Sequence, residues 1–386
     1  MQQYPAIVIG SGLTALGLVR CLGRLKIPVY HITTQGDFAR FSRWHKSVIT
    51  LDSLPTSNSI NYVLKRFQNQ CGVVFPSSDE LAIATASLTS DLSTILKSSL
   101  APKDCIISLI DKLILSKLLK KYNIPHPITT SIEKPDDING LDFLNKYFLK
   151  PRDSQKFIRE YGVKALHLEN FRGNKNKIEQ ILKSGHQIIL QEYVPGPATN
   201  HFFVDGFMDR FGNIRAFFAR QRIRMYPRDF GNSSCMISIP LGEIESAVSH
   251  VRKFLPAIKY RGIFSIEFKY DDRDKQYKLI EINARPWWYI EFAAYCGVNV
   301  CKLAYEDALG LDVKPILSYK VGKRFVYPYY DFACSSRLVR ERKLTLLNLA
   351  QFWWRAKTPM FCLDDPLPSL YNSYKSVSGY LRRRFR

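Results

Sequence analysis

Residues 262–285 constrain the fold more than any other stretch, because they predict two strands joined by a short polar turn. The segment reads GIFSIEFKYDDRDKQYKLIEINAR. The first half alternates Phe264, Ile266, Phe268 and Tyr270 with Ser265, Glu267 and Lys269. The second half alternates Ile280 and Ile282 with Leu279, Glu281 and Asn283. A period of two places each set on its own face of a sheet. Residues 271–274 are typical of a hairpin turn, so Glu267, Glu281 and Asn283 are expected to share one face.

These three side chains carry the oxygen donors that Mg²⁺ prefers, since this ion usually takes one or two carboxylates together with phosphate oxygens and water. Glu267, Glu281 and Asn283 are therefore candidate ligands for Mg²⁺ or Mn²⁺. Arg285 follows at the end of the strand, where a guanidinium is placed to meet a phosphoryl group. The hairpin alone also fits a solvent-facing strand pair with ordinary surface charges.

The N-terminal part of the chain alternates strands and helices, which predicts a parallel sheet. The expected elements are a strand at 6–9, a turn at 10–12, a helix at 14–25 and strands at 28–32 and 73–75.

The turn Gly10-Ser11-Gly12 begins a GxGxxA pattern, in which glycines let a phosphate approach the N-terminus of a helix. An NAD or FAD site also needs an acidic residue at the end of the second strand, but the next one here, Asp37, lies beyond it. We interpret the turn as a packing turn or as an anion site for another substrate. An NAD(P)- or FAD-binding oxidoreductase stays as an alternative.

A second unit begins near residue 108. A helix is expected over 111–122 and ends there because Pro125 and Pro127 bar its continuation. Strands are expected at 147–150, 187–193, 201–207 and 214–220, the last two joined by a turn at 209–213.

Composition predicts a soluble globular protein that attracts anions: the charged fraction is 23% and the net charge +22. Residues 313–386 hold 15 Lys and Arg against 4 Asp and Glu, and residues 381–386 read LRRRFR, a candidate patch for an anionic membrane. No apolar run is long enough to predict a transmembrane helix. Eight scattered cysteines predict reduced thiols and a cytoplasmic protein, with peripheral contact at the inner membrane face as an extension of that expectation.

Taken in order, these features resemble the ATP-grasp superfamily and, within it, the carboxylate–amine ligases. The resemblance implies an α/β protein with α+β lobes. Its parts would be a Rossmann-like pre-grasp domain at 1–105, an ATP-grasp domain of two lobes at 106–312 with a hinge near 191–196, and a basic, aromatic-rich segment at 313–386.

The resemblance also implies roles for individual residues. Lys112, and Lys150 in the sequence FLKP, would hold the phosphates of ATP, while Glu267, Glu281 and Asn283 would bind magnesium and Arg285 the transferred phosphoryl group. The hinge residues implied to surround the adenine are Gln191, Glu192, Tyr193 and Val194. Asn200 lies near the usual position of an acid that binds the ribose, although it is not an acid here.

Arg220, Arg222 and Arg224 alternate, so a strand would place all three on one face. Three guanidiniums together favour an anion, such as an acyl phosphate, a carboxylate or a phosphorylated acceptor. This stretch resembles a substrate-side segment of ligases related to D-aspartate ligase. Arg222 and Arg224 are therefore expected in catalysis and Arg220 in substrate binding.

One region departs from the family pattern. Residues 152–163 stand where the family has a Gly/Ser-rich loop over the phosphates, and Ser154 is one of only two typical residues. A catalytically weakened homologue that binds a nucleotide or another anion is therefore a further alternative.

The expected reaction is an ATP-dependent ligation of a carboxylate and an amine through an acyl phosphate. The substrates would be a small-molecule carboxylate and a small-molecule amine, and a glycan- or nucleotide-linked substrate of a cell-envelope or polysaccharide pathway is an extension of that expectation. The chain carries no RNA-binding motif, and carboxylates at 267–283 would repel phosphates without a metal, so nucleic acid is not expected.

Overall fold

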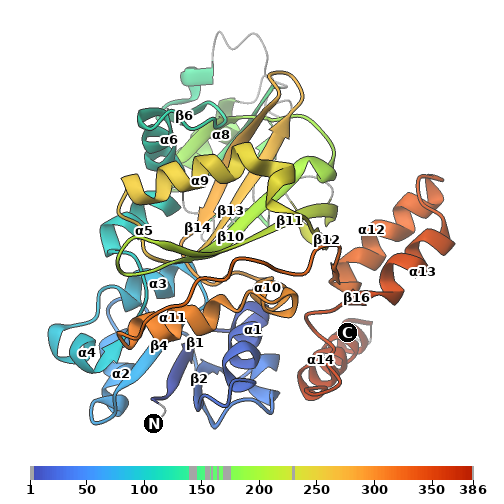
Figure 1. Ribbon diagram of the computed structural model, residues 1–386. Helices are drawn as coiled ribbons and strands as arrows, with labels where there is room; N and C mark the ends of the chain where they lie inside the picture. Colours follow the sequence, from blue (N-terminus) through green and yellow to red (C-terminus); the bar gives the residue numbers. More distant parts are fainter. Residues whose placement is uncertain are drawn as a thin grey trace.

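The computed structural model describes residues 4–138, 146–152, 157, 160–162, 165–167, 175–227 and 231–384. Within them the chain forms three sheets, of which the N-terminal one lies at one end of the molecule (Figure 1). None of the described helices is long and apolar enough to cross a membrane.

The first sheet is parallel, as the N-terminal alternation predicts, and its strand order is β3-β2-β1-β4-β5. Its elements are β1 (Ala6–Ile9), α1 (Gly12–Gly23), β2 (Val29–Thr34), β3 (Ser47–Leu51), α2 (Ile60–Leu64), β4 (Gly72–Pro76), α3 (Asp79–Thr85), α4 (Ser90–Ile95) and β5 (Leu96–Lys97). Helix α1 is buried at every position after Gly12. Because such a helix needs cover on all sides, α10 (Ile290–Cys296) and α11 (Val300–Ala308) pack against it from late in the sequence (Figure 1).

The second sheet is small and antiparallel, with the order β6-β9-β7-β8. Its elements and flanking helices are α5 (Lys103–Ile110), α6 (Lys112–Lys121), β6 (Thr129–Ile132), β7 (Tyr147–Pro151), β8 (Leu166–His167), α8 (Lys175–Lys183) and β9 (Ile188–Glu192). Asp111 caps α6 by accepting hydrogen bonds from the backbone N–H groups of Leu113 and Ile114. The sheet has a core of its own, centred on Leu149, Ile178 and Leu190.

The third sheet has seven strands in the order β14-β13-β10-β11-β12-β15-β16. The strands, with the helix α9 that covers the sheet, are β10 (His201–Met208), β11 (Ile214–Tyr226), β12 (Asn232–Ser238), α9 (Glu245–Ala257), β13 (Gly262–Asp271) and β14 (Gln276–Asn283). The predicted hairpin is thus present, and its turn occupies residues 272–275.

Residues 313–386 extend this sheet beyond β12 with β15 (Arg324–Val326) and the edge strand β16 (Ala356–Lys357). Their helices are α12 (Pro328–Arg340), α13 (Leu346–Trp354) and α14 (Leu367–Arg384). Helix α12 packs on β11, whereas α14 packs on the 3-10 turn Phe38–Phe41 of the first sheet's region. The C-terminal segment therefore joins the first and third sheets along one side of the molecule (Figure 1).

Candidate active site

A cavity of about 1680 Å³ lies between the small sheet and the seven-stranded sheet, and α3 and part of α12 border it. The residues predicted for the site that line it are Lys112, Lys150, Gln191, Glu192, Tyr193, Val194, Arg220, Arg222, Arg224, Glu267, Glu281, Asn283 and Arg285. Asn200, Gly10, Ser11 and Gly12 are not among the lining residues, and Ser154 lies outside the described residues. The folding of the chain thus gathers positions that are up to 173 residues apart in sequence, from Lys112 to Arg285.

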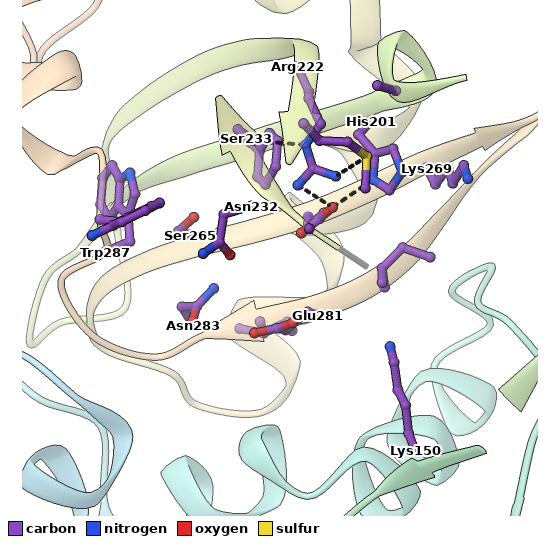
Figure 2. Close-up of a pocket in the computed structure, with 18 of the residues that line it drawn as sticks. Lys150, His201, Arg222, Asn232, Ser233, Ser265, Lys269, Glu281, Asn283 and Trp287 are labelled. Atoms are coloured by element: carbon purple, nitrogen blue, oxygen red, sulfur yellow. Dashed lines mark hydrogen bonds and ion pairs between the residues drawn. The ribbon is translucent and has the colours of Figure 1, made fainter. Parts of the chain in front are cut away.

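The predicted magnesium ligands share one face of the β13–β14 pair. Glu267 lies opposite Glu281 in the register, and Asn283 lies opposite Ser265. Figure 2 shows Glu281 and Asn283 on this face, with Lys150 rising toward the cavity from the small sheet on the other side. No group of three or more His, Cys, Asp and Glu side chains in the described part of the chain forms a metal site. Two carboxylates and an amide still fit a magnesium ion that takes its other ligands from phosphates and water.

A β-bulge after Glu267 interrupts the alternation of faces that the sequence predicts for β14. Glu267 pairs with Glu281, but Phe268 pairs with Leu279, so Ile280 has no partner in the register. Leu279 is consequently buried in the core with Phe268, whereas Ile280 lines the cavity. The sequence places these two neighbouring residues on the wrong faces because the bulge shifts the period of two by one position.

Glu267 is held in its ionised form by two neighbours. Its Oε1 atom accepts a hydrogen bond from Nδ1 of His201 at 2.6 Å and lies 3.0 Å from Nη2 of Arg222. Burial raises the pKa of Glu267, but the charge of Arg222 and the hydrogen bond from His201 outweigh it and hold the pKa well below its usual range. Both contacts involve Oε1, which leaves Oε2 for a further ligand.

His201 is a site residue that the sequence reasoning missed. It begins β10 and lies opposite Lys269 of β13, next to the pair Phe203–Glu267. Burial and the charge of Arg222 lower the pKa of His201 to about 4, although Glu267 opposes the shift. His201 and Phe203 are two residues apart on β10, and both line the cavity. Only the register of β10 with β13 reveals that they lie next to Glu267.

Lys150 and Lys112 approach the cavity from the small sheet and its neighbouring helix. Nζ of Lys150 donates to Oε1 of Gln191 at 3.0 Å and lies 4.9 Å from the ring centroid of Phe148. Lys112 is the first residue of α6, directly after the cap Asp111. Lys150 thus lies near the end of the inner strand β7 and Lys112 at the start of α6. Two cations on a packed backbone suit the binding of a polyphosphate.

Residues 191–194, the predicted hinge, line the cavity between the small and the seven-stranded sheets. The Glu192 side chain is tied to the surrounding structure: Oε1 lies 2.5 Å from Nη2 of Arg273 and 3.7 Å from Nζ of Lys278, while Oε2 accepts from the N–H of Ile128 at 3.2 Å. Asn200 instead donates to the carbonyl of Tyr270 and to Asp272, in the region of the β13–β14 turn. The hydrogen bonds of Asn200 thus hold it in this region, outside the cavity lining.

Arg220 and Arg224 lie in the cavity wall with protein carboxylates as partners. Nε of Arg220 lies 2.5 Å from Asp205, and Arg224 donates to both oxygens of Asp331 at 2.8 Å. Register shifts beside Arg224 direct it to α12, which carries Asp331. The anions that the three arginines require are therefore supplied at least in part by the protein, which the sequence pattern did not indicate.

Arg285 connects the cavity to the parallel sheet. Its Nε and Nη2 atoms donate to the two oxygens of Asp79 at 2.9 and 3.1 Å. Asp79 is the first residue of α3, which follows the strand β4 after the two residues Ser77 and Ser78. This bidentate pair fixes the plane of the guanidinium, so the first sheet orients a residue at the edge of the predicted metal face.

The glycine turn before α1 is occupied by the protein's own carboxylate. Asp37 accepts from the backbone N–H of Gly12 at 3.0 Å and from the hydroxyl of Thr33 at 2.8 Å. A Cβ at Gly10 would lie 1.7 Å from Oγ of Ser77, so this glycine permits close packing against the next loop. These contacts favour the packing interpretation of the turn over a dinucleotide site.

Comparisons with known proteins find relatives that align with about half of this chain. No family model matches the sequence. D-aspartate ligase from Enterococcus faecium (strain Aus0004) is 26% identical over 209 residues, which cover 52% of this chain and 49% of the ligase. The C-terminal section of the carbamoyl phosphate synthase large chain from Methanopyrus kandleri is 23% identical and is covered to 38%. The chain thus spans about half or less of the length of the curated relatives that it matches.

Solved structures resemble most of the chain. N5-carboxyaminoimidazole synthetase from Staphylococcus aureus, complexed with ADP, has a TM-score of 0.62 at 14% identity, covering 84% of this chain and 81% of that chain. Biotin carboxylase from Campylobacter jejuni has a TM-score of 0.65 at 15% identity, covering 84% and 74%. L-amino acid ligase from Bacillus licheniformis has a TM-score of 0.59 at 14% identity, covering 82% and 76%. At these identities the likeness establishes a common fold.

Proposed function

We propose that this chain, which has the ATP-grasp fold and is similar in sequence to D-aspartate ligase, is an ATP-dependent carboxylate–amine ligase. One observation carries the proposal: lysines from the small sheet and its helix share a single cavity with the oxygen ligands of β13 and β14. An arrangement of cations on one side and carboxylates on the other suits a polyphosphate bound together with a divalent metal.

The reaction would proceed in two steps. An oxygen of the substrate carboxylate attacks the γ-phosphorus of ATP, the bond to the β–γ bridging oxygen breaks, and ADP leaves. The amine nitrogen then attacks the acyl carbon, phosphate leaves, and the nitrogen loses a proton to give the amide. The protein contributes mainly position and charge to such phosphoryl transfers.

The residues of the cavity divide this work. Lys112 and Lys150 would hold the phosphates that are not transferred, and the hinge residues 191–194 would border the adenine. Glu267, Glu281 and Asn283 would hold magnesium, which supplies positive charge for the phosphate oxygens when bound. Arg285, oriented by Asp79, would offset charge on the transferred group.

Arg222 and Arg224 would stabilise the acyl phosphate or the acceptor. Their contacts with Glu267 and Asp331 limit the charge that each can offer to a substrate. Arg222 is the stronger candidate, because it also determines the ionisation of a metal ligand.

The two substrates are proposed at the level of their chemical class. Similarity to D-aspartate ligase supports a small amino acid or a related carboxylate as one of them, and an amine as the other. A glycan- or nucleotide-linked acceptor of a cell-envelope pathway would fit a cavity that extends beyond the predicted ATP contacts to Arg337 and Leu338 of α12. All eight cysteines are free, which supports a reducing compartment such as the cytoplasm.

Calorimetric titration with ATP, in the presence and absence of Mg²⁺, tests the nucleotide site. The wild type should bind with a strong dependence on magnesium, and Lys150→Ala should weaken binding roughly tenfold or more, since a charge-assisted contact is lost. Lys120→Ala, on the exposed side of α6, is the matched control and should bind as the wild type does.

A wild type that binds no ATP would contradict the proposal and favour a homologue without catalysis. If binding is confirmed, release of ADP in the presence of candidate carboxylates and amines would identify the substrates.

A further inference from the structure

The helix α13 is apolar but unusually exposed. All nine of its residues lie within the described part of the chain, and none of them is buried. Leu346, Leu347 and Trp354 are exposed by 69%, 67% and 88%. Large apolar side chains clustered on one short helix are uncommon on the surface of a soluble protein. Such a cluster marks a site of contact with a binding partner.

The two sides of α13 have different surroundings. The half-buried side packs on the protein: the ring of Phe352 lies 4.9 Å from the guanidinium of Arg224, and Nε1 of Trp353 donates to Asp331 at 2.7 Å. Leu346, Ala350 and Trp354 follow one another at intervals of four residues, so they form a row on the other side of the helix. This row, with the adjacent Leu347, is the outer face of α13 and faces solvent.

Positive charge flanks α13 along the sequence. Residues 337–357 contain six Lys and Arg against one Glu. Arg342 precedes the helix and Arg355 follows it, and both are exposed. The single acid, Glu341, lies beside Arg337 and Lys343, with distances of 2.7 and 2.9 Å.

We propose that the outer face of α13 docks on the surface of an anionic lipid bilayer. Leucines and a tryptophan suit the boundary between headgroups and acyl chains, and cations at both ends of the helix suit anionic headgroups. The charge argues against a second copy of the chain as the partner, because two such faces would bring like charges together.

The position of α13 agrees with a peripheral contact. Figure 1 shows α12 and α13 side by side at the edge of the molecule, away from the parallel sheet. The sequence alone directs attention to residues 381–386 instead, but their side chains lie outside the described residues. The outer face of α13 is therefore a separate surface, and its proposal does not depend on the proposed ligase activity.

Sedimentation with vesicles tests the proposal. The wild type should bind vesicles of phosphatidylcholine with phosphatidylglycerol, bind pure phosphatidylcholine weakly, and lose binding as salt is added. The triple variant Leu346→Ser, Leu347→Ser and Trp354→Ser should reduce partitioning roughly tenfold or more, since apolar burial in the bilayer is lost. These side chains are exposed, so the variant should keep the wild-type fold.

Two control variants make the test specific. Tyr62→Ser with Phe211→Ser removes apolar side chains that are 80% and 71% exposed elsewhere on the surface, and should bind as the wild type does. Arg382→Gln, Arg383→Gln and Arg384→Gln removes charge from the tail and should retain most of the binding.

Three outcomes would overturn the proposal: a wild type that does not bind anionic vesicles, a triple α13 variant that binds them unchanged, or binding abolished by the tail variant alone. A fourth is a wild-type dimer, seen by light scattering, that the triple α13 variant dissociates. It would assign the outer face to a second copy of the chain.

Discussion

At the scale of single residues, the predicted metal ligand Glu281 is less constrained by the protein than Glu267 is. It is exposed to the cavity, whereas Glu267 is held by Arg222 and His201. Glu281→Gln should therefore leave the fold intact but lower ADP formation by roughly 100-fold or more, because a neutral amide is a poor magnesium ligand. Rates of ADP release at saturating Mg²⁺ would measure the effect.

Glu80→Gln is the matched control for that change, since Glu80 is an exposed carboxylate that lines the same cavity from α3. The control should keep wild-type activity. A Glu281→Gln protein that releases ADP at the wild-type rate would remove Glu281 from the metal site.

At the scale of elements, the sequence Asp364-Asp365 anchors the C-terminal segment to the first helix. Asp365 accepts from Nε of Arg20 at 2.9 Å and from Ser42 Oγ at 2.7 Å. Arg20 is fully buried. It also donates to the backbone carbonyl of Asp365 and to two other backbone carbonyls of the C-terminal segment. Arg20 also pairs with the buried Glu291 at 3.2 Å, so Asp365 is one of its two carboxylate partners.

Asp365→Ala should lower the free energy of unfolding by about 1.5–3 kcal/mol, the cost of losing a hydrogen bond to a charged group, because Glu291 still pairs with Arg20. Asp364→Ala is the neighbouring control: its ion pair with Arg24 is largely exposed, so about 0–1 kcal/mol is expected. Urea unfolding curves would measure both. Equal losses from the two variants would contradict an anchoring role for Asp365.

The sequence predicts those elements whose pattern is local. Strand alternation places Glu267, Glu281 and Asn283 together, and prolines end the helix before residue 125. The bulge at Ile280 is not predictable in this way, because an extra residue in a strand leaves no mark in the composition.

The partners of the cavity residues are also hidden from the sequence. Asp205, Asp331 and Asp79 reach Arg220, Arg224 and Arg285 from segments 15, 107 and 206 residues away. Such pairs depend on how sheets and helices pack against one another. The sequence periodicity of a strand (two residues) or a helix (3.6 residues) contains no information about them. The roles proposed for these arginines must therefore be tested in the protein.

At the scale of the whole molecule, the buried His31 and the half-buried His201 should make the fold sensitive to mild acid. Burial lowers the pKa of His31 to about 4, although Asp37 opposes the shift, and His201 has a pKa of about 4 as well. In the unfolded chain both would titrate near 6.5. The unfolded state thus binds more protons than the folded state between pH 6.5 and 4.

The sign follows from this difference: stability is complete above pH 6.5 and falls as the pH decreases toward 4. Each histidine should contribute up to about 1.4 kcal/mol per pH unit within that window. His31→Gln keeps a donor for the carbonyl of Gly10, to which Nε2 of His31 donates at 3.0 Å, but it cannot titrate. The variant should lose less stability than the wild type between pH 6.5 and 5, as measured by urea unfolding at each pH. An unchanged slope would show that His31 is not buried in its neutral form.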